Sequence, residues 1–300
     1  MLQILIHDIL PVFSVPALGF LLGRIGKVSR DEAAAVNRVA FLVLQPALIF
    51  PLIAGVDFRA FEFGALAIYV LCEIGAFVLA FLIARHVFRR DMAEAWLLAM
   101  AVVFVNSLLY IWPISYLIYG EAAALPITAI VAWDSAVSFA FFIITTDLIA
   151  NRGADRTAAL RRVVTNPILI AILLGVIVNL TAIAVPVPLL TAMDFAGAGA
   201  APLTLFALGV ILSGQSLIPS GTVTGIVALK LLGFPALVWA ALHVVEIPPQ
   251  WAQLFILTSA GPSGAMAFAL AMLYGVRTDA IAPVIIWTSL LSLLSLAFLA

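Results

Sequence analysis

Charged residues are scarce in this sequence of 300 residues. Asp, Glu, Lys and Arg make up 10% of the chain, against about 25% in a typical soluble domain, while 65% of the residues are hydrophobic. The 14 basic residues nearly balance the 15 acidic ones, so the net charge points to no nucleic-acid partner and no acidic partner. This composition is typical of a protein embedded in a lipid bilayer.

Cysteine and histidine are almost absent. Cys72 alone excludes a disulfide framework within the chain and a zinc cluster of the multi-cysteine type. The three histidines have no partner set at a readable spacing, and no nucleotide-binding motif occurs. We therefore expect no enzyme, no cofactor, no metal and no ATP-driven transport. Residues 1–10 carry no basic flank, so we expect the first apolar stretch to stay as a helix rather than to be cleaved.

Long apolar runs fill most of the chain. A bilayer core about 30 Å thick needs roughly 20 apolar residues as helix, and only helices or closed barrels satisfy the backbone there. These runs are too long and too uniformly apolar for barrel strands. We predict ten membrane-spanning helices, numbered in chain order, at 4–23, 34–54, 63–86, 95–119, 123–149, 167–186, 197–217, 223–245, 251–274 and 280–299.

Basic residues gather on one side of this arrangement. The connections on the opposite side contain only Arg59, and Lys230 lies inside a predicted span. By the positive-inside rule the basic side is cytoplasmic, so both termini lie outside, on the periplasmic face of a cell (inner) membrane. Twelve basic residues fall on the cytoplasmic side: Arg24, Lys27, Arg30, Arg38, Arg85, Arg89, Arg90, Arg152, Arg156, Arg161, Arg162 and Arg277.

The two halves of the chain repeat each other. Matched Pro, Gly and Tyr residues recur in the same order at an offset within one residue of 156. The alternative is that Pro and Gly simply recur near the ends of membrane helices. The matched pairs are Pro11 with Pro167, Gly19 with Gly175, Pro46 with Pro202, Tyr119 with Tyr274 and Pro126 with Pro283.

An odd number of spans in each half forces the second half to enter from the opposite face. We therefore predict an inverted repeat, with residues 1–150 as repeat one (helices 1–5), 151–166 as a cytoplasmic linker and 167–300 as repeat two (helices 6–10). This architecture is associated with alternating-access transporters.

Helices 4 and 9 carry polar or flexible clusters near their centres. Asn106 and Ser107 lie in helix 4, with Pro113 further on, and Gly261, Pro262 and Ser263 lie in helix 9. Proline cannot donate to the helix ladder, and glycine removes the resistance to unwinding. We predict that both helices break there.

A break inside the membrane leaves a half-helix whose N-terminal amides point to the bilayer centre. Two such ends facing each other form a region of positive potential that suits a carboxylate. Kinks that serve packing alone are the alternative. The occurrence of both clusters at equivalent positions of the two repeats favours a substrate site.

Four segments together resemble the auxin efflux carrier family, the PIN-like carriers whose bacterial members are often labelled malonate transporters. The resemblance covers the whole chain. Its segments are Leu44 to Phe50 (LQPALIF), Phe104 to Ser107 (FVNS) with Pro113, Lys230 to Pro235 (KLLGFP), and the cluster around Pro262.

This resemblance implies a scaffold of helices 1, 2, 6 and 7 and a transport domain of helices 3–5 and 8–10. Helices 4 and 9 would cross at their breaks, beside the substrate. The resemblance also implies a homodimer formed through scaffold helices and an elevator-like movement of the transport domain.

Ionisable residues inside predicted spans need a reason, because burying a charge in a membrane is unfavourable. Glu73 in helix 3 and Lys230 in helix 8 lie at nearly equivalent repeat positions, so we predict that they approach each other or line one polar cavity. A structural ion pair and a coupling role stay open. Asp134 in helix 5 is a candidate proton carrier, because a carboxyl group in apolar surroundings holds its proton more tightly than in water. A hydrogen bond to a broken helix is the alternative.

Gln45 and Tyr110 are further candidates for substrate contact, with capping or packing as their alternative roles. The leading hypothesis is a secondary carrier of a small organic anion, a carboxylate such as malonate or an auxin-like monocarboxylate. The alternative is a carrier coupled to sodium or protons, of the bile-acid symporter or antiporter type. A passive channel or a membrane enzyme fits less well.

Overall fold

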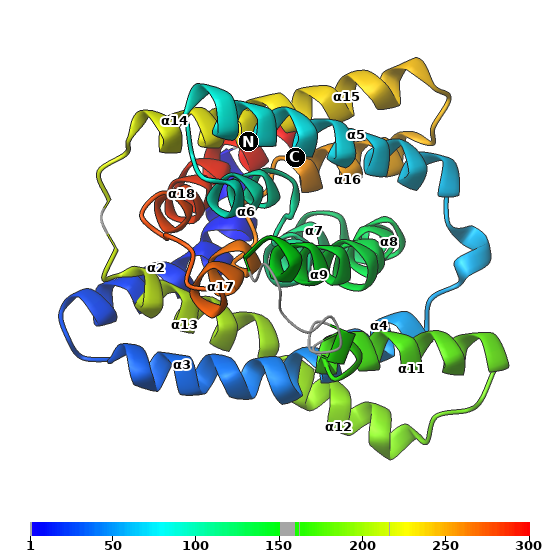
Figure 1. Cartoon of the computed structure of the whole chain (residues 1–300). Coiled ribbons are helices and arrows are strands. Elements are labelled where there is room, and N and C mark those ends of the chain that lie inside the picture. Colours follow the sequence, from blue (N-terminus) through cyan, green and yellow to red (C-terminus); the bar gives the residue numbers. More distant parts are fainter. Residues whose placement is uncertain (1, 151–159, 162, 216) are drawn as a thin grey trace.

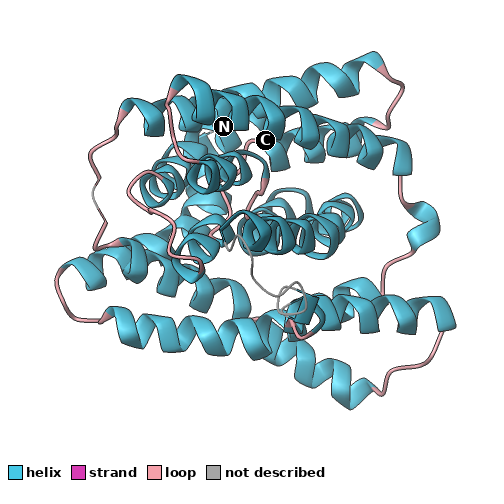
Figure 2. Ribbon diagram, viewed as in Figure 1, coloured by secondary structure: helices cyan, strands magenta, loops and turns pink. Residues whose placement is uncertain are grey.

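The computed structural model describes residues 2–150, 160–161, 163–215 and 217–300. In these ranges the named elements are all helices, joined by turns and loops (Figure 2). The expected all-helical membrane class is confirmed at this level. Seven helical stretches of the described chain are long and apolar enough to cross a membrane: Leu2–Arg24, Arg30–Ala54, Phe63–Val87, Ser107–Ala150, Val187–Leu212, Gly221–Val244 and Ile281–Leu299.

Three kinds of helix alternate along the chain, and short π-helical or 3-10 turns (η) interrupt the α-helices. In chain order the elements are α1 (Leu2–Ile4), η1 (Leu5–Ile9), α2 (Leu10–Arg24), α3 (Arg30–Val39), η2 (Ala40–Leu44), α4 (Gln45–Ala54), η3 (Phe58–Ala60), α5 (Phe63–Leu82), η4 (Ile83–Val87), α6 (Met92–Val103), η5 (Ser107–Ile111), α7 (Trp112–Tyr119), η6 (Gly120–Ala123), α8 (Ala124–Trp133), η7 (Asp134–Ser138), α9 (Phe139–Ala150), α11 (Pro167–Thr181), α12 (Val187–Gly197), α13 (Ala200–Leu212), α14 (Gly221–Ala228), η8 (Leu229–Gly233), α15 (Phe234–Val244), α16 (Pro249–Ser259), α17 (Met266–Leu273) and α18 (Ile281–Leu299).

The boundaries of several of the ten predicted runs differ from those of the helices in the structure. Run 167–186 becomes α11, which stops at Thr181 because Ala182 adopts a left-handed conformation. Run 251–274 divides into α16 and α17, and run 95–119 divides between α6 and the stretch that starts at Ser107. Run 197–217 starts too late, because α12 opens at Val187 with Pro188 in its first turn, where proline suits a helix. The count of ten spans therefore stays a prediction.

Widened, π-helical turns precede four prolines. A proline has no N–H, and its ring clashes with the carbonyl four residues earlier, so the preceding turn opens. In η2 the Gln45 amide donates to the Ala40 carbonyl, five residues back. Each of these prolines is the second residue after its turn: Pro11 after η1, Pro46 after η2, Pro113 after η5 and Pro235 after η8.

The helices form layers. In Figure 1, α3, α4, α11, α12 and α13 lie along the bottom, α5, α14, α15 and α16 lie along the top, and α6 to α9 with α17 lie between them. Residues of the middle layer are deeply buried, and Leu97 to Val103 of α6 are all buried. By contrast, the ends of α12 expose large apolar side chains, such as Phe195 at 88%.

Glycines allow close helix contacts in and beside the lower layer. Helix α2 packs along α13, and α4 packs along α11. A Cβ atom on Gly19 would collide with the Phe206 carbonyl oxygen, and one on Gly209 would collide with the Pro16 carbonyl oxygen. A Cβ atom on Gly175 would lie 3.0 Å from Cβ of Ile53. Small residues let membrane helices approach in this way.

Part of the predicted organisation falls on residues outside the described ranges. The predicted linker 151–166 is covered only at 160–161 and 163–166, and Arg152, Arg156 and Arg162 lie outside the described residues.

Candidate functional site

Two non-helical segments meet in the middle layer. Helix α6 ends at Val103 and η5 begins at Ser107, while α16 ends at Ser259 and α17 begins at Met266. Val105 and Ser263 form an antiparallel bridge between the two gaps. The Asn106 amide donates to the Pro262 carbonyl at 3.0 Å, and the Gly264 amide donates to the Phe104 carbonyl at 2.7 Å. These two hydrogen bonds pair four backbone groups of the two segments with each other.

The residue types in these gaps explain why the segments come so close. A Cβ atom on Gly264 would lie 2.8 Å from the Phe104 ring, and one on Gly261 would collide with the Ile111 side chain. Pro262 has no amide hydrogen, so it leaves no unpaired donor at the break, and its carbonyl accepts from Asn106. A side chain at Gly264 would push against both the ring and the backbone of Phe104, whereas the Ile111 side chain could move away from one at Gly261.

Side chains pair with the remaining polar groups at the gaps. The Ser263 hydroxyl donates to the Ala101 carbonyl at 2.6 Å, and its amide donates to the Thr288 hydroxyl at 3.2 Å. The Lys230 ammonium donates to the Ser259 carbonyl at 2.6 Å, at the C-terminal end of α16. A cation is stabilised there by the negative end of the helix dipole.

A small cavity of about 110 Å³ lies where η5 and α17 begin. Ser107 to Leu109, at the start of η5, line one part of its wall, and Ala265 and Met266, at the start of α17, line another. The first turn of a helix presents amides without intrahelical partners, and the dipole adds positive potential. Both helix starts therefore favour an anion in this cavity.

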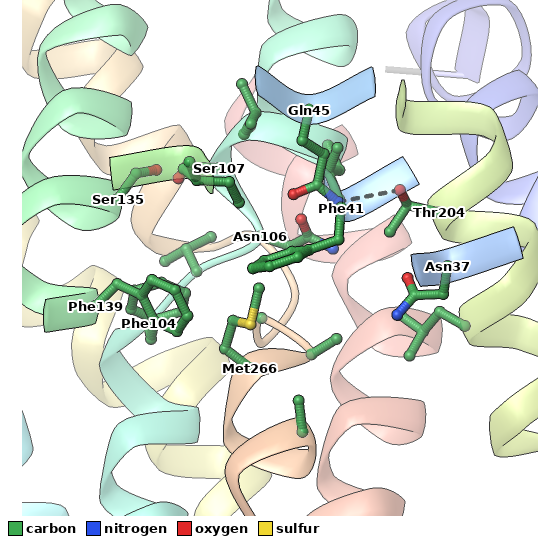
Figure 3. Close-up of a pocket in the computed structure, with 18 residues that line it drawn as sticks. Asn37, Phe41, Gln45, Phe104, Asn106, Ser107, Ser135, Phe139, Thr204 and Met266 are labelled. Atoms are coloured by element: carbon green, nitrogen blue, oxygen red, sulfur yellow. Dashed lines mark hydrogen bonds between the residues drawn. The ribbon is translucent and has the colours of Figure 1, made fainter. Parts of the chain in front are cut away.

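The lining side chains come from two sides of the cavity. Figure 3 shows Gln45, Thr204 and Asn37 on one side, facing Ser107 and Ser135 on the other. The Gln45 amide donates to the Thr204 hydroxyl at 3.2 Å. Every lining residue in the described ranges is uncharged, so the amide, hydroxyl and backbone groups are the polar partners on offer. Phe41, Phe104, Phe139 and Met266 supply the apolar wall.

A group of three buried ionisable side chains, Asp134, Glu73 and Lys230, reaches the cavity wall through Asp134. Asp134 accepts a hydrogen bond from the Ser107 hydroxyl at 3.1 Å, and Glu73 accepts one from the Trp133 indole at 2.8 Å. The two carboxyl groups are within hydrogen-bonding reach of each other, and the Lys230 charge acts on both. Lys230 forms no ion pair with a described residue and also lies over the Phe234 ring, 5.0 Å from its centre.

The candidates named from the sequence divide into those at the cavity and those near it. Asn106, Ser107 and Gln45 line the cavity. Gly261, Pro262 and Ser263 build the contact between the gaps, while Gly264 to Met266, three residues later, supply the wall. Tyr110 lies elsewhere, with its ring 4.7 Å from that of Phe13 and its side chain in another cavity. Pro113 lies in the first turn of α7.

Sequence reasoning did not name Thr204, Asn37 or Phe41. All three come from the lower layer, which reaches the cavity only in the folded chain. One signal was available, since Asn37 and Thr204 are polar residues within or beside apolar runs. Gln45 and Thr204 are 159 residues apart, so only the packing of α4 and α13 reveals their hydrogen bond.

A larger cavity of about 550 Å³ lies between α5, α6 and α9. Its walls are mostly apolar, although Glu73 is among the lining residues. Seven of the lining residues are aromatic: Phe77, Phe81, Trp96, Phe104, Trp133, Phe141 and Phe142. Only the smaller cavity is met by two helix N-termini, so the smaller one is the better candidate for substrate.

Comparison with known proteins extends over the whole chain. Residues 4–300 match the family described as membrane transport protein. A protein of Rhizobium meliloti named "Putative malonate transporter" is 28% identical, over 95% of this chain and 91% of that protein. An uncharacterized transporter of Methanothermobacter thermautotrophicus is 27% identical, over 97% of this chain and 95% of that protein. One of Methanocaldococcus jannaschii is 23% identical, over 96% of each.

The apolar helices of the fold, the cavity at the starts of η5 and α17 and the family match agree. The names of the relatives describe transporters and no enzyme. The chain therefore belongs to the membrane transport protein family, that of the auxin efflux (PIN-like) carriers, and is a multi-pass membrane transporter.

Proposed function

We propose that this transporter is a secondary carrier or facilitator of a small organic anion, which binds in the cavity at the starts of η5 and α17. The observation that carries the proposal is the meeting of two helix N-termini at one cavity whose described lining residues are all uncharged. Asn106, Ser107 and Gln45 would orient the anion with their amide and hydroxyl groups.

A carboxylate is the anion that fits this chemistry best. It accepts several hydrogen bonds from amides and hydroxyls and needs no fixed cation when helix ends face it. The name of the Rhizobium meliloti relative makes malonate one test substrate. Lys230 is not among the lining residues, so a monocarboxylate, including an auxin-like acid, fits at least as well as a dicarboxylate.

Ten membrane spans in two inverted repeats remain the architecture that we propose. Helix packing supports it. In the ten-helix numbering, α2 with α13 is the pair of helices 1 and 7, and α11 with α4 is the pair of helices 6 and 2. An inverted repeat relates these pairs to each other. Gly19 and Gly175, matched between the repeats, each allow one of these close contacts.

An elevator-like movement is the transport mechanism that we propose. The cavity has walls from both proposed domains. Asn37, Gln45 and Thr204 belong to the scaffold (helices 1, 2, 6 and 7), whereas Asn106 and Met266 belong to the transport domain (helices 3–5 and 8–10). Sliding of the transport domain past the scaffold would carry the anion across and open each side in turn. Gln45 and Thr204 would then stay behind.

The proposed setting is the cell (inner) membrane with both termini outside, because the basic connections mark the cytoplasmic side. A homodimer through scaffold helices is part of the proposal. The exposed apolar side chains of α12 support a lipid or subunit contact there.

Coupling to a cation is the second candidate function. The buried carboxyl groups of Glu73 and Asp134 beside the cavity favour it, since intramembrane acids mark ion and proton pathways. Uptake that depends on sodium would support this alternative.

A thermal-shift screen of the purified protein tests the proposal. Monocarboxylates and dicarboxylates, malonate among them, should raise the unfolding temperature at one or more pH values, because a ligand of the folded state stabilises it. Matched concentrations of amines and neutral sugars serve as controls. Stabilisation by amines or sugars, but by no acid, would overturn the anion assignment.

A further inference from the structure

The carboxyl groups of Glu73 and Asp134 lie within hydrogen-bonding reach of each other in buried surroundings, and Glu73 also lines the larger cavity. Glu73 is 6% exposed, Asp134 is 1% exposed and Lys230 is fully buried. The other titratable groups that face the pair are Tyr69 and Cys72, on the same helix as Glu73. Lys230 therefore supplies the positive charge among the described groups that face the pair.

Hydrogen bonding requires a proton between the two acids. Oδ2 of Asp134 accepts from Ser107, but Oδ1 of Asp134 finds no donor among the described groups when both acids are ionised. Two ionised carboxylates offer only acceptors, whereas one protonated acid donates to the other. A proton held by the pair therefore satisfies the contact between Glu73 and Asp134.

Charge balance gives the same proton count. Lys230, as an ammonium, donates to the Ser259 carbonyl at the end of α16 and lies over an aromatic ring, and both contacts favour its charged form. One ammonium and two carboxylates would leave a net negative charge buried in the membrane, which is unfavourable. One proton on the pair makes the group of three neutral.

Ser107 joins this group to the substrate cavity. Its hydroxyl donates to Asp134, and the same residue lines the cavity wall. When Asp134 is ionised, its carboxylate accepts the hydrogen bond from this hydroxyl. When Asp134 carries a proton, the hydroxyl is free to donate to an anion in the cavity. A bound monoanion also adds a negative charge, which a second proton on the pair would offset.

We propose that Glu73 and Asp134 form a proton-binding site, coupled to the anion cavity through the Ser107 hydroxyl. The pair holds one proton when the cavity is empty and takes up a second when a monoanion binds, so that anion and proton travel together. This proposal rests on the proposed function for its second proton only; the first proton is a property of the empty protein.

Infrared spectroscopy of the full-length protein in detergent tests the first proton. The wild type should show the C=O stretch of a protonated carboxyl near neutral pH, shifted by exchange into D₂O. The band should be lost in both Glu73→Gln and Asp134→Asn, because one remaining acid opposite Lys230 stays ionised. Glu94→Gln is the matched control. Glu94 is a buried acid paired with Arg90 at 3.1 Å, so its replacement should leave the band unchanged.

Ser107→Ala tests the link to the cavity. Removing the hydroxyl takes away a hydrogen bond that stabilises ionised Asp134, so the band should persist to higher pH by up to about one unit. Absence of the band in the wild type, or its survival in both amide variants, would overturn the proton site. An unshifted band in Ser107→Ala would overturn the link. If an amide variant fails to fold, the wild-type band and its Ser107→Ala shift still decide.

The second proton is tested with acetate and malonate as probes. Binding of acetate, a monoanion, should increase the band and take up about one proton from a weakly buffered solution. Acetate binding detected by thermal shift without proton uptake would overturn the coupling. If acetate, malonate and every acid in the wider screen fail to stabilise the protein, both the anion assignment and the coupled second proton are wrong. The infrared band of the protein without ligand still decides whether the first proton is present.

Discussion

Asn106 has separate tasks for its backbone and its side chain. Its amide and carbonyl tie the gap after α6 to Pro262 and to the first turn of η5. Its side chain makes no capping hydrogen bond to the turn that it precedes and lines the cavity instead. The side chain is therefore available for substrate, while the backbone contacts are independent of side-chain identity.

Asn106→Ala should weaken carboxylate binding without unfolding the protein. A lost hydrogen bond to a charged group is worth about 1.5–3 kcal/mol, or roughly a 10- to 100-fold rise in Kd. Titration of the thermal shift with ligand concentration measures the change. Asn179→Ala is the control. The Asn179 amide donates to the carbonyls of Ile53, Ala54 and Val56, so this variant should lower the unfolding temperature and leave Kd unchanged. Equal Kd values in the Asn106 variant and the wild type would remove Asn106 from the site.

Lys230→Met should destabilise the protein. The Ser259 carbonyl would lose its donor and the two carboxyl groups would lose their cation, so we expect a loss of about 1–3 kcal/mol, the value of one buried group left unpaired. The unfolding temperature measures it, with Lys27→Met, at an exposed loop residue, as the control. Unchanged folding and unchanged transport in the Lys230 variant would argue against both a structural and a coupling role.

Local sequence pointed to part of the site and could not reach the rest. The non-helical segments of the structure fall at the clusters around Asn106 and Pro262. Proline and glycine disfavour helix in the segment around Pro262, whereas residues 104–106 contain neither and pair with that segment instead. The contribution of Gly264 to Met266, rather than Gly261 to Ser263, depends on how the two gaps pair. Thr204 reaches Gln45 only through packing of distant helices, and no local pattern encodes that contact.

At the scale of helices, proline has different effects at different positions. Before Pro46, Pro113 and Pro235 the helix continues through a widened turn. At Pro262, flanked by Gly261 and Gly264, helix formation stops for six residues, from Ala260 to Ala265. A nearby glycine does not by itself end a helix at a proline, since Gly233 lies two residues before Pro235 in a continuous helix. At Pro262 two glycines add backbone freedom, and the segment also pairs with the one that follows α6. Helix boundaries predicted from hydropathy alone miss such effects. The run predicted at 197–217 likewise omits α12, which begins at Val187.

Gly209→Ala should loosen the contact between α2 and α13. The added methyl group would collide with the backbone carbonyl of Pro16, which cannot move as a side chain can, so we expect a loss of about 1–3 kcal/mol. Gly64→Ala is the matched control, because nothing lies within 4 Å of its added Cβ. The unfolding temperature of each variant measures the difference. Equal temperatures for both variants would contradict the close helix contact.

At the scale of the whole molecule, the proposed topology puts different connections of the chain on the two sides of the membrane, so labelling of single cysteines can tell the sides apart. The single native Cys72 is buried, so a Cys72→Ala background gives a chain without background labelling. Lys27 and Arg59 lie in exposed connections on opposite sides of the proposed arrangement.

Arg59→Cys in this background should react with a membrane-impermeant maleimide on intact cells, whereas Lys27→Cys should react only after permeabilisation. The reason is that the positive-inside rule puts Lys27 in the cytoplasm. Labelling is read as a shift in mass on a gel. The reverse pattern, or labelling of both residues on intact cells, would contradict the proposed orientation.

The central claim is that the cavity at the starts of η5 and α17 carries a carboxylate across the membrane. Counterflow in proteoliposomes tests it most directly, with the carboxylate that stabilises the protein best loaded inside and the labelled compound outside. We predict saturable accumulation of label by the wild type and its loss in Asn106→Ala reconstituted to the same level. No carboxylate exchange, or a flux that never saturates as a channel would give, would contradict the claim.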